Sequence, residues 1–201
     1  MIGAVILAAG AGARLGGVAK ALLPRGDTTF LGSIVRTAAA AGVAPEAIVV
    51  VVAAPHGDAV AREAARRGLW GQAVWNDEPA RGMASSIALG FAALAERAGE
   101  HVHAALLWPV DHPAVRAATI EALADALGER GELDAAIPTV DGRGGHPPLI
   151  ARALWPRLAR CDEEADGARG VLRAASAVRV AVDDAGVVRD VDEPADLEGL
   201  P

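Results

Sequence analysis

Buried-strand and helix patterns alternate along the whole 201-residue chain, and this alternation constrains the fold more than any other feature. The strand patterns are short apolar runs rich in Val, Ile and Leu, whereas the helix patterns repeat apolar residues every three or four positions. Short connections between such elements predict an α/β fold: a three-layer, Rossmann-like, mostly parallel sheet with helices on both faces. We expect strands at 2–8, 48–54, 73–75, 104–108, 134–137, 178–182 and 187–191, and helices at 29–41, 57–67, 83–98, 113–127, 152–159 and 167–175.

Length and composition narrow the class of protein further. We expect one domain over residues 1–201, since 52% hydrophobic residues suffice for a core and exclude a disordered chain. The formal charge of −7 argues against nucleic-acid binding. The apolar start has no basic flank and is too short to span a membrane, so we expect a cytoplasmic protein without membrane contact. The single cysteine, Cys161, excludes an internal disulfide, and we expect it at the surface without a role.

The predicted topology also places the chemistry. Ligands of parallel α/β sheets bind beyond the carboxyl ends of the strands. The loops that follow residues 8, 76 and 108 come after strand patterns, so we expect them along one edge of the sheet. The functional residues should lie there.

The first of these loops is rich in glycine. Residues 7–24 read LAAGAGARLGGVAKALLP, and glycines there allow positive φ and a close approach of backbone N–H groups to an anion. Neither the Walker pattern nor the dinucleotide fingerprint fits, because Leu15 stands where each requires a glycine. The loop therefore favours an anion site of another kind.

Charge supports this interpretation. Residues 1–45 carry four basic residues against one acidic residue, a net +3, which leaves −10 for the rest of the chain. Lys20 is the single lysine among 19 basic residues, and it lies in this segment. A cationic, glycine-rich loop at a strand end attracts a polyanion such as a triphosphate. The alternative is an ordinary solvated surface loop.

The segment LAAGAGARLGGVAKALL closely resembles the signature L-A-A-G-x-G-x-R-[ML]-G-x-x-K-x-L-L of the MobA-like nucleotidyltransferases. Among these it is most similar to the molybdenum cofactor cytidylyltransferases. The resemblance implies a fold of the nucleotide-diphospho-sugar transferase type. It also implies transfer of a nucleotidyl group from an NTP to a phosphorylated acceptor, with Mg²⁺ as cofactor and pyrophosphate as product. Carried over, it places backbone atoms near the base and ribose at Ala8, Ala9 and Gly10, and phosphate contacts at Gly12, Arg14 and Lys20.

A second block, WNDEPARGMASSIALG at 75–90, resembles the family pattern N-x-x-x-x-x-G-[ML]-x-x-S-[IL]-x-x-G. Gly82 permits a close backbone approach, and the resemblance assigns Gly82 and Ser86 to nucleotide binding. Ser85 and Ser86 could instead cap the helix that starts there. Asn76, the single asparagine, either pairs with a base or anchors the loop.

Two carboxylates are the candidate Mg²⁺ ligands. Asp111 in WPVDHP (108–113) follows a strand and matches the metal residue of the family's P-x-D-x-P block. It could also cap a helix that begins at residue 113. The tail DVDEPADLEGL (190–200) resembles the family's closing block and offers Asp192, with Asp190 as the competing ligand. Asp192 could instead cap a short helix that starts at Pro194.

The acceptor side is less sharply defined. GRGGHPPLI (142–150) resembles the family's G-x-x-G-H-P block, in which His146 either contacts the acceptor or is a structural turn residue. Arg169 in GARGVL (167–172) either reaches the acceptor or is solvated. His112 is adjacent to Asp111 but is not expected to bind the metal, because oxygen donors suit Mg²⁺ better.

Attack of an acceptor phosphate on the α-phosphorus needs positioning and charge neutralisation rather than a protein nucleophile. We therefore expect Lys20, Arg14 and Asp111 to carry catalysis, with CTP favoured as the donor and molybdopterin as the acceptor. A molybdoenzyme or its chaperone is the expected protein partner. A sugar phosphate or another small phosphorylated metabolite is an alternative acceptor. A non-catalytic nucleotide-binding accessory protein of molybdoenzyme maturation is a further alternative, although such a protein would tend to lose Asp111.

Overall fold

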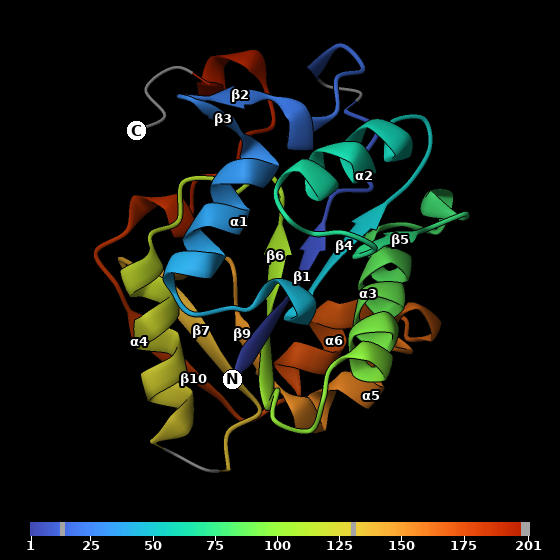
Figure 1. The fold of residues 1–201 in the computed structure, drawn as a ribbon. Helices are drawn as coiled ribbons and strands as arrows, with labels where there is room; N and C mark the ends of the chain where they lie inside the picture. Colours follow the sequence, from blue (N-terminus) through green and yellow to red (C-terminus); the bar gives the residue numbers. More distant parts are fainter. Residues whose placement is uncertain (13–14, 130–131, 198–201) are drawn as a thin grey trace.

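A computed structural model describes residues 1–12, 15–129 and 132–197. It shows three layers, with a central sheet between two sets of helices (Figure 1). The sheet is eight-stranded, in the order β10-β7-β9-β6-β1-β4-β5, with β8 paired to β7. Its strands are β1 (Ile2–Leu7), β4 (Ile48–Val52), β5 (Ala73–Trp75), β6 (Ala104–Pro109), β7 (Ala135–Val140), β8 (Arg143–Gly144), β9 (Leu149–Ala151) and β10 (Ala177–Ala181).

The central strands run parallel, as predicted. β1 lies between β4 and β6 and pairs with both in parallel, with Val5 opposite Val49 and Leu107. β5 continues this direction at one edge of the sheet, and β7 and β10 form a further parallel pair. β9 and β8 are antiparallel to their neighbours. The carboxyl ends of β1 and β6 therefore open on the same edge.

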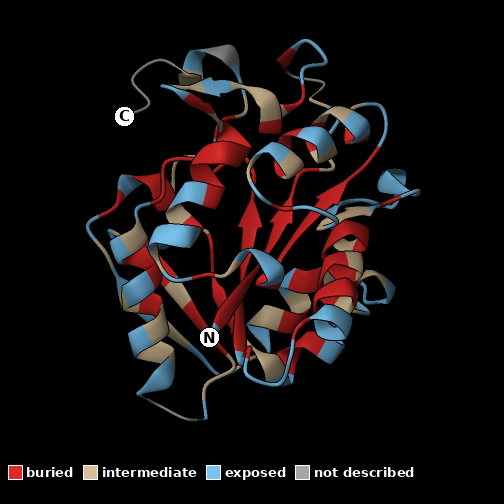
Figure 2. Cartoon of the chain, viewed as in Figure 1, coloured by how far each residue is buried: buried red, intermediate tan, exposed pale blue. Residues whose placement is uncertain are grey.

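Alternation along the strands explains the two helical layers, because successive residues of a strand point to opposite faces. Ile6 and Val50 pack against the helices α1 (Phe30–Ala40), α2 (Gly57–Arg66) and α4 (Ala117–Gly128). Val5 and Val51 pack against α3 (Met83–Arg97), α5 (Trp155–Leu158) and α6 (Gly167–Arg173). Figure 2 shows the central strands and the inward sides of the helices buried. Both faces of the sheet are covered, so its strands read as continuous apolar runs.

The six helix predictions each correspond to a helical segment, within shifts at the ends. The first helix begins where predicted, because the Thr29 side chain accepts a hydrogen bond from the Gly32 N–H and caps it. The segment predicted at 152–159 divides into a 3-10 turn, η5 (Arg152–Leu154), and α5. Further 3-10 turns are η2 (Lys20–Leu22), η3 (Pro45–Ala47), η4 (Pro79–Arg81), η6 (Cys161–Glu163), η7 (Ala185–Val187) and η8 (Pro194–Leu197).

Two predictions were wrong, one of the start of a helix and one of a strand. The helix predicted from residue 113 begins at Ala117, because the preceding carbonyls accept side-chain bonds from Ser33 and Thr37 and the Arg116 N–H donates to Asp184. The strand predicted at 187–191 is not formed. That segment contains the end of η7 and a loop that bonds to other loops.

Four strand pairings were missed because they involve very short strands. β9 and β8 were not predicted, and neither was the separate two-stranded hairpin of β2 (Pro24–Arg25) and β3 (Thr28–Thr29). Runs of two or three residues carry no periodicity from which a strand could be recognised. The sheet is consequently less purely parallel than the longer runs alone indicate.

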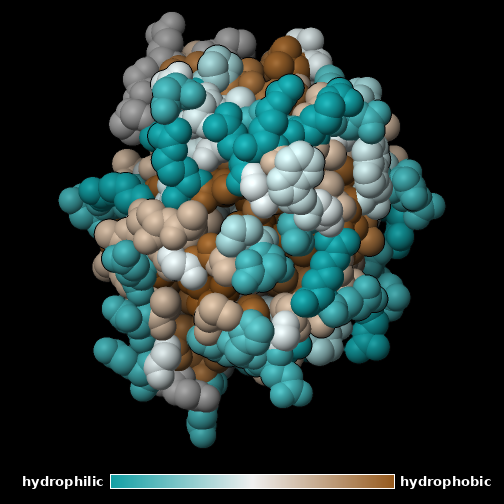
Figure 3. Space-filling model, viewed as in Figure 1, coloured by the Kyte–Doolittle hydropathy of each residue, from teal (hydrophilic) through white to brown (hydrophobic). Residues whose placement is uncertain are grey.

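The surface and the cysteine complete the description. On the face drawn in Figure 3, hydrophilic side chains project from the outer sides of the helices, with hydrophobic groups showing between them. In the described parts of the chain, no helix is long and apolar enough to cross a membrane. The expectation that Cys161 is at the surface was wrong. Cys161 is fully buried in the apolar cluster that contains the inward-facing residues of α3, and its Sγ lies 3.5 Å from the Ala84 carbonyl oxygen.

Candidate nucleotide and metal site

A pocket of about 680 Å³ opens at the carboxyl ends of β1 and β6. This is the edge of the sheet at which the sequence predicts the functional residues. One wall is the first loop and the start of η2, and the opposite wall is η4 with the beginning of α3. The third wall combines the loop after β6, the β8–β9 loop and the tail. Most of the predicted residues line it, namely Ala8, Ala9, Gly10, Gly12, Lys20, Gly82, Ser86, Asp111, His146 and Asp192.

The first loop closes around Gly12. Its φ is +64°, and a Cβ built there would lie 1.8 Å from the Val18 carbonyl oxygen. The Gly12 carbonyl accepts hydrogen bonds from the N–H groups of Leu15 and Gly17. No residue with a side chain fits this turn, which brings the loop back toward η2 and Lys20. Arg14, assigned to phosphate contact, lies outside the described residues.

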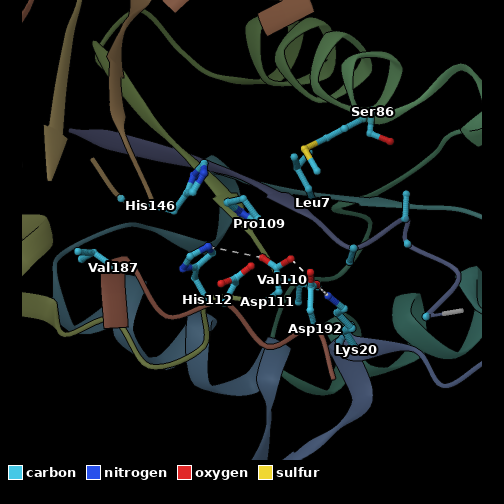
Figure 4. A pocket seen from close by; sticks show the side chains of 18 of the residues that line it. Leu7, Lys20, Ser86, Pro109, Val110, Asp111, His112, His146, Val187 and Asp192 are labelled. Carbon is cyan, nitrogen blue, oxygen red and sulfur yellow. Dashed lines mark hydrogen bonds and ion pairs between the residues drawn. The ribbon is translucent and has the colours of Figure 1, made fainter. Parts of the chain in front are cut away.

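Lys20 joins the two predicted metal carboxylates. Its Nζ lies 3.5 Å from Asp111 Oδ2 and forms an ion pair with Asp192 Oδ1. Figure 4 shows Asp111 between His112 on one side and the Lys20–Asp192 pair on the other. The side chains are only 19%, 24% and 35% exposed for Lys20, Asp111 and Asp192, so water screens these charges weakly. Three loops thus bring one cation and two anions to one point.

The carboxylates fit a divalent cation. Asp111 Oδ1 is buried and has no hydrogen-bond partner in the described structure, its nearest polar contact being His112 Nε2 at 3.8 Å, and a buried carboxylate oxygen without a hydrogen bond is costly. Oxygen donors of this kind suit Mg²⁺ or Mn²⁺. Among the described residues there is no group of three or more His, Cys, Asp or Glu side chains that could hold a metal. A cation here would need further ligands from substrate phosphates or water, as Mg²⁺ usually does.

The tail is held against this point by backbone bonds. The Val191 N–H donates to the Asp111 carbonyl at 3.0 Å. The N–H groups of Asp192 and Glu193 both donate to Asp196 Oδ2, at 2.9 and 2.8 Å. These bonds hold the pKa of Asp196 below its ordinary value. Asp192 therefore stands beside Asp111 and pairs with Lys20, whereas Asp190 lines the pocket on the same loop.

The alternative that Asp111 caps a helix is not supported. The helix starts at Ala117, with Arg116 as its N-cap. The carboxylate at this helix start belongs to Asp184, which is buried and accepts bonds from the Arg116 N–H at 2.8 Å and Thr119 Oγ1 at 2.6 Å. The Asp111 side chain therefore does not cap this helix, and it lines the pocket instead.

The second loop is anchored by Asn76. Its Nδ2 donates to both Ser85 Oγ and Ser86 Oγ at 2.9 Å, and its Oδ1 accepts from the Glu78 N–H at 3.0 Å. Asn76 is buried and is not among the lining residues, so of its two predicted roles the structure favours loop anchoring. The Ser85 hydroxyl donates a hydrogen bond to the Gly82 carbonyl oxygen at 2.8 Å, whereas Ser86 lines the pocket. Gly82 has a φ of +91°, which favours glycine at this turn into α3.

His146 lies at the other end of the pocket. Its ring is 5.0 Å from the His112 ring, and its Nδ1 is buried without a hydrogen-bond partner in the described structure. Burial, with the nearby His112 adding to it, lowers the pKa of His146 to about 4. The ring is therefore neutral near pH 7. It can recognise an acceptor through a hydrogen bond rather than through positive charge.

Sequence reasoning missed several lining residues. Arg143 and Val187 belong to the wall around His146, and Val187 accepts a hydrogen bond from the His146 N–H at 2.7 Å. This contact joins residues far apart in sequence, so no local pattern indicates it. His112 also lines the pocket, although it was considered only as a metal ligand. Arg169, proposed to reach the acceptor, is exposed and is not a lining residue.

Known proteins share this fold. The chain is similar to Rv0371c of Mycobacterium tuberculosis H37Rv, with 28% identity, a TM-score of 0.76, and coverage of 98% of this chain and 95% of that one. A manganese complex of Rv0371C aligns with 23% identity, a TM-score of 0.70 and coverage of 97% and 95%. The molybdopterin-guanine dinucleotide biosynthesis protein A of Archaeoglobus fulgidus aligns with 18% identity, a TM-score of 0.68 and coverage of 98% and 95%. A search of curated proteins finds no match.

The sequence carries the family assignment more directly. The family model described as the MobA-like NTP transferase domain matches residues 4–180, which include the first loop, Asn76, Gly82, Asp111 and His146. The pocket lies at the carboxyl ends of the strands, where open parallel α/β sheets generally bind their ligands. The chain belongs to the MobA-like NTP transferase family and is a nucleotidyltransferase.

Proposed function

We propose that this protein transfers a nucleoside monophosphate from an NTP, with CTP preferred, to the phosphate of molybdopterin or its molybdenum cofactor form, and releases pyrophosphate. One observation carries the proposal. Two carboxylates from separate loops meet the single lysine of the chain in a pocket at the carboxyl ends of the central strands. This arrangement suits the neutralisation of a triphosphate rather than a covalent protein intermediate.

The nucleotide would occupy the half of the pocket between the first loop and α3. Backbone of Ala8, Ala9 and Gly10 lies there opposite Gly82 and Ser86. The Ser86 oxygen accepts the Asn76 amide, so its own proton is available for an acceptor atom of the nucleotide. The Lys20 ammonium is positioned to contact the phosphates beyond the ribose.

Asp111 and Asp192 would hold the magnesium ion. Once bound, the ion would supply positive charge to the α-phosphate and to the leaving pyrophosphate. The lack of a hydrogen bond to Asp111 Oδ1 and the shared contact of both carboxylates with Lys20 support this pair of ligands over Asp190. Manganese in the related Rv0371C structure supports a divalent ion in this fold.

The acceptor would enter over His146 and Arg143. His146 offers a neutral ring, and Arg143 an exposed cation, on the wall next to Val187. Positioning the acceptor phosphate in line with the leaving pyrophosphate contributes most of the rate, since both reactants are anionic and need orientation and charge neutralisation. The described residues of the pocket contain no cysteine, and its serine, Ser86, is bonded to Asn76.

The test is a matrix of donors and acceptors. The protein is incubated with Mg²⁺, each of the four NTPs, and molybdopterin or a sugar 1-phosphate, and pyrophosphate release is followed. We expect release with molybdopterin, fastest with CTP. Release with GTP alone would overturn the base preference, and release only with the sugar phosphate would overturn the acceptor. Silence with every pair would overturn the proposal.

A further inference from the structure

We propose that Lys20 is an internal counter-cation of the metal site, which keeps a divalent ion weakly bound until a triphosphate binds the lysine. This inference rests on the proposed function, because it takes Asp111 and Asp192 as the metal ligands. It adds an order of binding, in which the triphosphate contacts Lys20 before the carboxylates hold the metal ion tightly. Lys20 then belongs to the carboxylates in the free protein and to the phosphates in the loaded protein.

The first observation is the position of the Lys20 ammonium. It contacts Asp111 Oδ2 at 3.5 Å and also forms an ion pair with Asp192 Oδ1. These two oxygens belong to the two carboxylates that would hold a divalent ion. The lysine therefore neutralises the same carboxylates that the metal would bind, in a part of the pocket where all three side chains are partly buried.

The second observation concerns charge balance. Two carboxylates held together repel each other, and Lys20 reduces that repulsion in the free protein. A divalent ion that binds the same two carboxylates would have the full positive charge of Lys20 only a few ångströms away. Repulsion at that distance opposes binding of the metal alone.

The third observation is that Lys20 and the two carboxylates come from different parts of the pocket wall. Lys20 comes from η2, beside the glycine loop that forms the phosphate wall, whereas the carboxylates come from the loop after β6 and from the tail. A triphosphate on the glycine loop provides new anionic partners for the ammonium. Metal and triphosphate binding then favour each other, and by linkage this coupling is reciprocal.

The proposal predicts opposite effects of one substitution. Lys20→Met removes the competing charge, so the nucleotide-free protein should bind Mn²⁺ more tightly, by about tenfold or more. The same variant loses a phosphate contact, so it should bind the Mn²⁺–CTP complex about tenfold more weakly. A variant that merely disturbed the fold would weaken both.

The experiment titrates the nucleotide-free protein with Mn²⁺, followed by electron paramagnetic resonance, and titrates the Mn²⁺–CTP complex by calorimetry. Arg36→Met is the matched control, since it removes one positive charge from an exposed side chain that pairs with Asp27. Its Mn²⁺ affinity should stay within about twofold of wild type. Combining Lys20→Met with Asp192→Asn should reduce the effect of the lysine change, because the pair that it breaks is already neutralised.

The outcomes separate the two claims. If Asp111→Asn and Asp192→Asn weaken Mn²⁺ binding but Lys20→Met does not strengthen it, the counter-cation proposal is wrong and the metal site stands. If neither carboxylate change affects Mn²⁺ binding, the metal assignment of the proposed function is wrong, and the counter-cation proposal fails with it. Tighter Mn²⁺ binding in Lys20→Met alone, lost in the Asp192→Asn background, supports the proposal.

Discussion

Single residues in the pocket act mainly through charge and hydrogen-bond direction. Lys20, Asp111 and Asp192 form a partly buried cluster with a net charge of −1, which a divalent ion and a triphosphate can complete. Asn76 fixes the direction of hydrogen bonds on the opposite wall, since it donates to both serines of the α3 start. The charged cluster and the Asn76 hydrogen bonds both depend on surrounding residues that hold these side chains in position.

Asp196 is one such neighbour, although it does not line the pocket. Its carboxylate accepts hydrogen bonds from the N–H groups of Asp192 and Glu193 and thereby fixes the backbone that carries the second proposed metal ligand. We predict that Asp196→Ala weakens Mn²⁺ binding about tenfold, because the ligand loses its orientation. Asp196→Asn keeps an acceptor oxygen and should restore most of the affinity. Equal Mn²⁺ affinities for wild type and Asp196→Ala, measured by the same titration, would contradict this role.

The sequence predicted these residues unevenly. Glycine and lysine spacing in the first loop indicated Gly12 and Lys20, because their types are required by local backbone geometry and by charge. The neighbours that position them were not predicted. The bonds of Asp196 are local, but its residue type is equally typical of a solvated tail. The Val187 contact with His146 spans distant segments and leaves no local trace.

At the scale of elements, the loops around the pocket are tied together by Asp184. This buried carboxylate accepts the Thr119 hydroxyl at 2.6 Å, the Arg116 N–H at 2.8 Å and the Gly186 N–H at 3.1 Å. It joins the start of α4 to η7, which presents Val187 to the acceptor wall. Close packing supports the same junction, since a Cβ at Gly186 would lie 2.5 Å from the Ala114 carbonyl oxygen.

We therefore predict that Asp184→Ala destabilises the fold by about 3 kcal/mol, because several buried donors lose their acceptor. Asp184→Asn retains one acceptor oxygen and should lose less. Urea unfolding followed by fluorescence measures both. A change below about 0.5 kcal/mol in Asp184→Ala would show that the junction does not depend on this carboxylate.

Predictions of helices and strands were correct where the apolar pattern extends over several turns. They were wrong where hydrogen bonds between distant segments determine where an element begins or whether it forms. α1, α2 and α3 have several turns of pattern, and their ends were predicted within a residue or two. The start of α4 depends on Asp184, 65 residues away from Thr119, and the failed strand at 187–191 depends on the same junction. β9 inserts antiparallel between β6 and β7, which no three-residue run could reveal.

At the scale of the whole molecule, the sheet order sets the site. β1 and β6 are neighbours, so their two loops meet, and the tail returns to the same edge through the bond from Val191 to Asp111. Strand alternation was sufficient to predict this edge from the sequence. It could not predict which carboxylate of the tail would reach Asp111, because that depends on the turn made by Asp196.

Acid stability provides a test that involves the whole fold. The folded pKa of His146 is about 4, below its ordinary 6.5, so the unfolded chain takes up the proton first as the pH falls. The free energy of unfolding should decrease between about pH 6.5 and pH 4, by up to about 3 kcal/mol from this residue. Denaturant titrations of wild type and His146→Gln across that range measure it. The pH dependence of the difference between the two proteins should disappear if the ring titrates normally.

We propose that Asp111, together with Asp192 and Lys20, forms the centre of nucleotidyl transfer. The most direct measurement is the rate of pyrophosphate release by Asp111→Asn, with Asp27→Asn, an exposed carboxylate paired with Arg36, as the matched control. We predict a loss of about 1,000-fold or more in Asp111→Asn with its melting temperature preserved, since the metal ion that would neutralise the anionic transition state loses one of its two proposed protein ligands. The control should keep wild-type activity. An Asp111→Asn protein that releases pyrophosphate at the wild-type rate would contradict the account.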